Sequence, residues 1–247
     1  KKHLLAFLSI LFLASVLHSQ NPTTSKYIFN SFTVAESLPH NFVDDLYRDS
    51  RGFLWISTGG GGLVRYDGYE FMTLNVSSLP ISLKSNYIRQ VSEDNFNRLW
   101  VVSNMGIDVI NLRTMQKAAI TSGSEEMDKL AGINTQRVIK DQNGSIWILS
   151  VEKIYKIDFD KDGNITKLIT SENKTGESPH SFTTINEIDN TVYAGSKGII
   201  FTVSVSQNGS LSFKQLNEAL DFGENTFISS MMKKDNTLWI GTDNGLY

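Results

Sequence analysis

The sequence predicts an all-β protein, namely a β-propeller made of four-stranded antiparallel blades. The first observation is an aromatic residue that recurs about every 46 residues, at Trp55, Trp100, Trp147, Tyr193 and Trp239. The second is a cluster of Asp, Asn and Gly shortly before each aromatic, which is typical of tight turns between strands. The third is that no segment after residue 19 keeps helical periodicity for ten or more residues. Four short strands in a repeat of this length are typical of a propeller blade.

Each repeat is interpreted as four strands in order. The first strand precedes the turn and is expected at residues 42–47, 87–92, 137–140, 182–187 and 227–232. The turns are expected at residues 49–52, 94–97, 141–144, 189–190 and 235–236. The second strand carries the aromatic residue, and a glycine turn leads to an alternating third strand at residues 63–66, 107–110 and 154–157. The fourth strand is expected at residues 71–74, 118–121 and 165–170.

The recurring aromatics are interpreted as packing residues. A four-stranded sheet this small cannot cover both of its faces, so neighbouring blades must pack face to face. A large aromatic on the second strand fills the space between two such sheets. We therefore do not expect the tryptophans to form a ligand-binding cage. Residues 124–131 and 217–220 could each form a helical turn, and both are interpreted as loops between blades.

The chain is predicted to divide into a signal peptide at residues 1–19 and propeller repeats at residues 20–247. The basic start KKH precedes an apolar run at residues 4–17, which is shorter than the roughly 20 residues that span a bilayer. Cleavage is expected after Ser19, and an uncleaved anchor or a buried helix is the alternative. The fifth blade is incomplete at the C-terminus, so we expect the N-terminal part of a larger propeller. Residues 27–34 are then expected to form an outer closing strand.

Charge and cysteine content exclude several functions. The formal net charge is -3, and a mildly acidic surface repels phosphate, so no nucleic acid partner is expected. The chain has no cysteine, which excludes disulfides, thiolate metal sites and cysteine nucleophiles. The absence of cysteine fits the expected location of an exported protein on the periplasmic side of the inner membrane.

The unit LPHNFVDDLYRDSRGFLWISTGGGGLVRYDGYEFMTL, which begins at Leu38, resembles the two-component regulator propeller repeat. That repeat has a D-x-x-G-x-L-W-I-G-T core followed by G-L-x-R-Y-D-G. The matching positions are Asp49, Gly52, Leu54, Trp55, Ile56, Thr58, Gly62, Leu63, Arg65, Tyr66, Asp67 and Gly68. Ser57 replaces the usual glycine, the last unit matches at residues 238–242 and 245–246, and the middle units are degenerate. The resemblance covers roughly residues 27–247.

The resemblance implies the periplasmic sensor region of a hybrid histidine kinase. Such proteins sense an extracellular ligand, often an oligosaccharide, and signal through a membrane helix to a kinase. The kinase parts are not in this sequence, so no enzymatic activity is expected of this segment. The expected partners are an oligosaccharide or another small extracellular ligand, the remainder of the same polypeptide, and a second copy in a homodimer. The family pattern marks blade structure and carries no ligand residues, so the ligand-binding residues stay unknown at this point.

Few residues have a pattern that points to chemistry. His40 and His180 are isolated and are expected to lie in polar loops, so we predict no catalytic residues, no metal site and no cofactor. Residues 158–163 (DFDKDG) resemble the start of a calcium loop, but Ile169 stands where an EF-hand needs glutamate. We therefore interpret Asp158 to Asp162 as part of a hairpin between a third and a fourth strand, with calcium binding left open. The glycines at 59–62 are interpreted as a turn, with close approach to a ligand as the alternative.

Two further functions stay open. A secreted propeller enzyme, such as a lyase or a glycosidase, needs clustered acids, histidines or metal ligands at the channel mouth. A protein-binding scaffold needs only an accessible face. The low histidine content disfavours the enzyme, and a membrane helix and kinase encoded downstream would favour the sensor over the scaffold.

Overall fold

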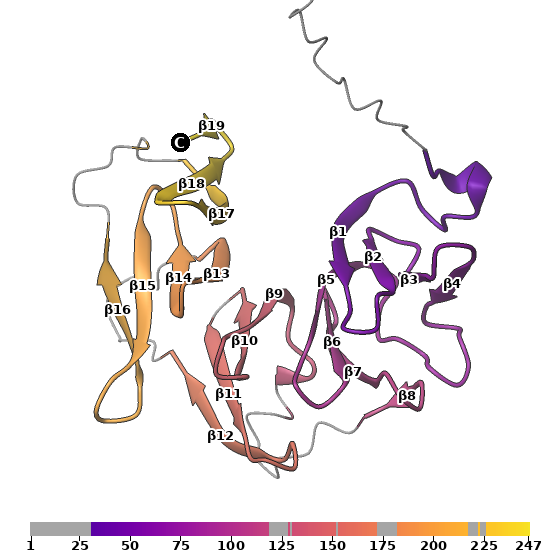
Figure 1. Cartoon of the computed structure of the whole chain (residues 1–247), viewed down its shortest axis with the longest axis horizontal. Coiled ribbons are helices and arrows are strands. Elements are labelled where there is room, and N and C mark those ends of the chain that lie inside the picture. The colour runs from indigo at the N-terminus through magenta and orange to yellow at the C-terminus, as the bar shows by residue number, and fades with distance from the viewer. Residues whose placement is uncertain are drawn as a thin grey trace, which may run out of the picture. The chain divides into compact units, whose positions relative to one another are not determined.

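The computed structural model describes residues 31–118, 128, 130–151, 153–171, 182–216, 222 and 226–247. Figure 1 shows that this part of the chain is built from successive antiparallel sheets. Four sheets have four strands and the last has three, so the predicted all-β propeller of four-stranded blades is confirmed. The predicted signal peptide at residues 1–19 and His180 lie outside the described residues.

The blades follow one another along the chain. Blade 1 consists of β1 (Val43–Arg48), β2 (Leu54–Thr58), β3 (Leu63–Tyr66) and β4 (Phe71–Leu74). Blade 2 consists of β5 (Ile88–Glu93), β6 (Arg98–Ser103), β7 (Gly106–Asn111) and β8 (Gln116–Lys117). Blade 3 consists of β9 (Thr135–Lys140), β10 (Ile146–Ser150), β11 (Ile154–Phe159) and β12 (Ile165–Thr170). Blade 4 consists of β13 (Thr184–Ile188), β14 (Thr191–Gly195), β15 (Ile200–Val205) and β16 (Leu211–Gln215). Blade 5 consists of β17 (Ile228–Lys234), β18 (Thr237–Thr242) and β19 (Gly245–Leu246).

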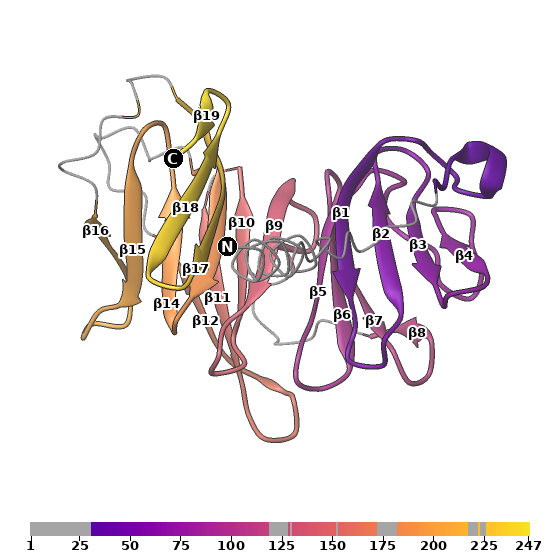
Figure 2. The same cartoon turned by 45° about the horizontal axis from the view of Figure 1, so that its top comes forward.

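The first strand of each blade lies on the inner side of the propeller. β1, β5, β9, β13 and β17 contact one another in turn. Figures 1 and 2 show the later strands of each blade fanning outward from them. These five strands therefore lie nearest to a common axis.

Three short predictions need correction. The fourth strand of blade 2 is Gln116–Lys117 and begins earlier than expected, because Asn111 Oδ1 accepts hydrogen bonds from the backbone of Arg113 and Thr114 and turns the chain back early; of the expected residues 118–121, only Ala118 is described, and it is not in a strand. Residues 31–33 are not a strand and Val34–Glu36 is a 3-10 helix (η1), so the described part of the predicted closing strand is wrong. The predicted loop at 124–131 contains helical backbone at Asp128 and Leu130.

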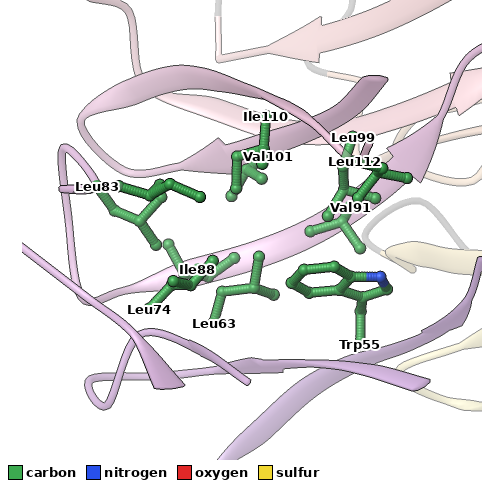
Figure 3. Packing of buried hydrophobic residues seen from close by; sticks show 11 residues of the cluster. Trp55, Leu63, Leu74, Leu83, Ile88, Val91, Leu99, Val101, Ile110 and Leu112 are labelled. Carbon is green, nitrogen blue, oxygen red and sulfur yellow. The ribbon is translucent and has the colours of Figure 1, made fainter. Parts of the chain in front are cut away.

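The core lies between blades, as the repeat predicts. Trp55, Leu63 and Leu74 of blade 1 pack against apolar residues of blade 2, among them Val91 and Leu99 (Figure 3). Equivalent clusters surround Trp100 between blades 2 and 3, and Trp147 between blades 3 and 4. The interpretation of these three tryptophans as packing residues is confirmed, since at most 3% of each is exposed.

A buried aspartate fixes each of the first three tryptophans. Trp Nε1 donates a hydrogen bond to the aspartate Oδ2 at 2.9 Å for Trp55 and Asp49, 2.9 Å for Trp100 and Asp94, and 2.8 Å for Trp147 and Asp141. In each case the aspartate Oδ1 accepts backbone N–H groups of its own turn. One carboxylate therefore closes the first hairpin and orients the aromatic filler.

The fifth repeat departs from this arrangement. Its first hairpin is closed by the pair Lys234 and Thr237, a shorter turn than in blades 1–3. Trp239 is 40% exposed, and its cross-strand neighbour Met232 is 57% exposed. The other face of blade 5, with Met231 and Ile240, packs against blade 4. The tryptophan face of blade 5 is thus open in the described part of the chain.

Candidate functional site

The inner strands enclose a polar cavity near the axis. Its volume is about 380 Å³, and its lining comes from blades 1 to 4: Asp44, Asp45, Tyr87, Arg89, Gln90, Gln136, Arg137 and Thr183. Most of these side chains are charged or carry an amide. This axial pocket is the candidate functional site.

A β-bulge delivers two adjacent polar residues to the pocket from each of the first three blades. The register between the first and second strands shifts at Asp44, at Arg89 and at Gln136. In a regular strand, adjacent side chains point to opposite faces. A bulge adds one residue and re-aims a side chain. Each bulged residue and the residue after it, Asp45, Gln90 and Arg137 respectively, therefore both line the pocket.

Burial perturbs the charged groups of the pocket. Burial raises the pKa of Asp45 to about 6, although the nearby Arg137 guanidinium acts to lower it. Burial also raises the pKa of Asp44, with Arg89 opposing the change. The pKa of Arg137 is lowered by burial, and the Asp45 charge counteracts this. The pocket thus holds two acids and two bases that interact at a distance in partly dehydrated surroundings.

Hydrogen bonds connect the blades that line the pocket, but one buried donor of the pocket takes no part in them. Arg137 Nη2 donates to the Ser229 carbonyl oxygen at 2.8 Å, which connects blade 3 to blade 5. The Val138 N–H donates to Gln90 Oε1 at 3.0 Å, which connects blade 3 to blade 2. In contrast, Arg89 Nε is buried and has no hydrogen-bond partner among the described residues. Within the same residues, the two arginines form no salt bridge with the two aspartates.

Replacing Asp45 by asparagine should remove a pH-dependent penalty on stability. The folded-state pKa of about 6 lies above the ordinary value, so the cost of ionising Asp45 in the fold develops as the pH rises from the ordinary pKa to about 6, is complete above that, and vanishes at low pH. We expect D45N to raise the melting temperature at pH 8 by about 2 to 4 °C, which corresponds to about 1 kcal/mol after allowance for partial solvent exposure. At pH 4, D45N and the unmodified protein should have the same melting temperature.

Differential scanning calorimetry between pH 4 and pH 8 measures this difference. D162N is the matched control, because the Asp162 side chain is exposed. Equal melting temperatures of D45N and the unmodified protein at pH 8 would contradict the raised pKa.

The histidine and the glycine run singled out in the sequence lie together, and Gly59 borders the axial pocket, since it pairs with Tyr87 and a Cβ there would lie 3.3 Å from Asp44 Oδ2. His40 Nδ1 accepts the backbone N–H of Phe42 at 3.1 Å, and its ring packs on Gly60. Gly62 has a φ of 97°, and a Cβ there would lie 2.2 Å from the Leu74 carbonyl oxygen. The glycines therefore allow close approach of the protein's own chain, which confirms the turn interpretation.

The aspartates at 158–162 form the predicted hairpin between β11 and β12. Asp160 Oδ1 accepts the backbone N–H groups of Asp162 and Asn164, each at 2.9 Å. Asp160 Oδ2 accepts the Asn164 side-chain amide at 2.9 Å, and Asp158 pairs with Lys156. These oxygens already have partners within the turn. Among the described residues, no three His, Cys, Asp or Glu side chains gather in a way that could hold a metal ion.

The pocket residues could not be singled out from the sequence, because the pattern that marks them is weak. Three blades carry a polar pair two residues into the first strand, at 44–45, 89–90 and 136–137. Such pairs look like ordinary solvent-exposed positions unless a bulge is known to turn both inward. An offset common to the three repeats was the available clue.

Comparisons with known proteins agree with the fold. Residues 37–60 match the family described as Two component regulator propeller. No curated protein sequence matches the chain significantly. Among the described residues, none forms a helix long and apolar enough to cross a bilayer.

Solved structures resemble the chain over most of its length. One is described as the extracellular domain of a hybrid two component system from B. thetaiotaomicron, with 23% identity over 85% of this chain and 28% of that chain, and a TM-score of 0.63. A second such domain from the same organism has 22% identity over 89% of this chain and 35% of that chain, and a TM-score of 0.62. A virginiamycin B lyase from Staphylococcus aureus with quinupristin has 14% identity over 90% of this chain and 70% of that chain, and a TM-score of 0.61.

These likenesses support the fold more than the activity. The chain spans only 28% and 35% of the two extracellular domains. The same fold also occurs in the lyase, so fold alone does not distinguish a sensor from an enzyme. The family match confirms the resemblance that the sequence predicted: residues 37–60 match the two component regulator propeller, and the chain around them folds as a β-propeller.

Proposed function

We propose that this chain is the ligand-sensing part of a two-component regulator that lies on the periplasmic side of the inner membrane and detects a carbohydrate without turning it over. The observation that carries the proposal is the axial pocket. It is large enough for one or two sugar rings, and its planar side chains (Asp, Arg and Gln) can each bind two adjacent hydroxyls. It lies in a propeller that carries the regulator repeat.

Two other features support this proposal. The solved structures described above include extracellular domains of hybrid two component systems. Residues 1–19 have the basic, apolar and small-residue pattern of a signal peptide, which supports export. Membrane anchoring of the complete protein is part of the same proposal.

The proposed mechanism is a population shift. A ligand bound between inner strands contacts several blades at once, and Arg137 already links blade 3 to the Ser229 carbonyl of blade 5. A ligand that bonds to Arg137 competes with this link and changes the relative stability of blade arrangements. Differential affinity for two arrangements is sufficient to transmit a signal.

The open face of blade 5 supports a partner within the same polypeptide. Trp239, Met232 and Leu246 are exposed by 40%, 57% and 66% respectively. The corresponding tryptophan faces of blades 1–3 are each covered by the next blade. We propose that a further four-stranded sheet of the complete protein covers this face, and that a homodimer carries the signal across the membrane.

A thermal-shift screen of neutral and acidic mono- and disaccharides tests ligand sensing. A ligand at 100 times its dissociation constant stabilises a protein by about 2.7 kcal/mol, so the melting temperature should rise by about 5 to 10 °C. Chromatography of the ligand after incubation should show it unchanged. Turnover of the sugar would favour the lyase or glycosidase alternative, and a screen without any shift would contradict carbohydrate sensing.

A further inference from the structure

The two arginines of the axial pocket line one cavity, and one of them has a donor without a partner among the described residues. Arg89 on β5 and Arg137 on β9 come from neighbouring inner strands, and both line the pocket. Arg89 Nε is buried without a partner, and its guanidinium lies 5.9 Å from the centroid of the Tyr87 ring. A buried donor that lacks an acceptor destabilises the free protein. A ligand acceptor placed there recovers that loss.

Guanidinium groups recognise carboxylates better than they recognise hydroxyls. The planar fork of arginine donates two parallel hydrogen bonds to a carboxylate, and the charge strengthens both bonds. Burial strengthens such contacts further, because the surroundings screen less than water does. Arg137 is also partly dehydrated, since burial lowers its pKa. An anion in the pocket would therefore meet two partly buried cations.

The aspartates on the opposite wall limit the charge of the ligand. Asp44 and Asp45 balance the two arginines, so a multiply charged anion would be repelled. The backbone N–H groups of Leu46 and Val91 act to lower the pKa of Asp45, whereas Arg89 Nε has no hydrogen-bond partner among the described residues. This difference favours an anion over a cation as the missing partner. The aspartates and glutamines then serve as partners for hydroxyl groups.

We propose that the axial pocket binds a small polyhydroxylated monocarboxylate, with its carboxylate held by Arg89 and Arg137 and its hydroxyls by Asp44, Asp45 and the glutamines. This proposal rests on the proposed function, because it assigns a ligand class to the same pocket. The recognised group is the carboxylate together with neighbouring hydroxyls, whether the source is a sugar acid or another hydroxy acid.

Binding should be coupled to protonation of Asp45. The charged groups around this carboxylate are Asp44 on its own strand, Arg89 on β5 and Arg137 on β9. A bound carboxylate neutralises part of the arginine field that keeps Asp45 ionised, so the pKa of Asp45 rises and a proton is taken up. Affinity should therefore increase as the pH falls from 7.5 to 5.5, while the ligand itself stays ionised.

Isothermal titration calorimetry with glucuronate, glucose and glucosamine tests the proposal, because the three compounds share one sugar ring and carry a negative, a neutral and a positive charge respectively. We expect glucuronate to bind at least about tenfold more tightly than glucose at pH 6, and glucosamine to bind no better than glucose. R89Q should lower the glucuronate affinity at least about tenfold. The control R113Q, which changes an exposed arginine outside the pocket, should not alter it.

Lactate and gluconate added as competitors distinguish the two sources of the ligand. Displacement of glucuronate by gluconate alone indicates a sugar acid, and displacement by both indicates a wider range of hydroxy acids. If R89Q does not fold, R89K retains the charge but lacks the fork and should still lose affinity. D45N should bind glucuronate with an affinity that no longer depends on pH between 5.5 and 7.5.

Several results would overturn the proposal. Tighter binding of glucose or glucosamine than of glucuronate would reject carboxylate recognition but would leave the proposed ligand sensing intact. Equal losses of glucuronate affinity in R89Q and R113Q would show that Arg89 does not bind the ligand. No binding of any of the three compounds at about 10 mM would reject the ligand class, while the broader saccharide screen decides separately on sensing.

Discussion

Replacing Trp100 by alanine is expected to lower the free energy of unfolding by about 3 to 5 kcal/mol. Trp100 is 1% exposed and fills the space between blades 2 and 3, together with Ile146 and Ile148. The substitution leaves a cavity that rigid sheets cannot close. It also removes the Nε1 donor that bonds to the buried Asp94. Urea denaturation monitored by circular dichroism measures the loss.

Trp239 provides the matched control within the same repeat. It occupies the equivalent position, but 40% of it is exposed and its face is open. We therefore expect W239A to lower the free energy of unfolding by less than about 1 kcal/mol, as exposed substitutions generally do. Equal losses in W100A and W239A would mean that blade 5 is covered in solution. In a longer form of the protein that contains a covering sheet, the effect of W239A should increase.

Removing the Asp94 carboxylate should have an effect of similar size. Asp94 is 3% exposed and its Oδ1 accepts the backbone N–H groups of Phe96 and Arg98 at 2.8 and 3.0 Å. Its Oδ2 accepts Trp100 Nε1 at 2.9 Å and Arg98 Nε at 2.6 Å. D94A leaves these donors unpaired, one of them charged, and should lower the free energy of unfolding by about 3 to 5 kcal/mol.

The controls for D94A separate hydrogen bonding from charge. D94N keeps one oxygen acceptor for the turn and should lose less stability than D94A. D162A changes an exposed aspartate in the hairpin of blade 3, and its effect should stay within about 0.5 kcal/mol. A loss in D94A no larger than that in D162A would show that the aspartate contributes little to the blade.

The first hairpins show why so much of the fold was predictable. Asp94 and Trp100 are close in sequence, and the contact between them is local, so the same residue types repeat wherever the same turn is built. Strand positions followed from those turns to within a few residues. The errors at residues 31–34 and at the start of the fourth strand of blade 2 fall in or next to connections, where local side-chain bonds such as the one from the Thr114 N–H to Asn111 Oδ1 decide the path.

The pocket could not be predicted in the same way. Asp45 and Arg137 interact across 92 positions of sequence, and nothing near either residue indicates the other. Their meeting depends on the stacking angle of successive blades and on bulges in the first strands. The bulges leave only a weak mark, the polar pair at a common offset in three repeats, and the stacking angle leaves none in the residue types.

The sequence by itself determined the blade, because each blade depends on contacts between residues within one repeat: the turn aspartate, the aromatic filler and the alternating strands. Only the tertiary structure decided which polar residues share the axis and how far each is dehydrated. The physical reason is that burial and electrostatic coupling depend on the distance between blades, and that distance is set by packing over the whole array. The raised pKa of Asp45 and the unpartnered Arg89 Nε are therefore features that only the tertiary structure decided.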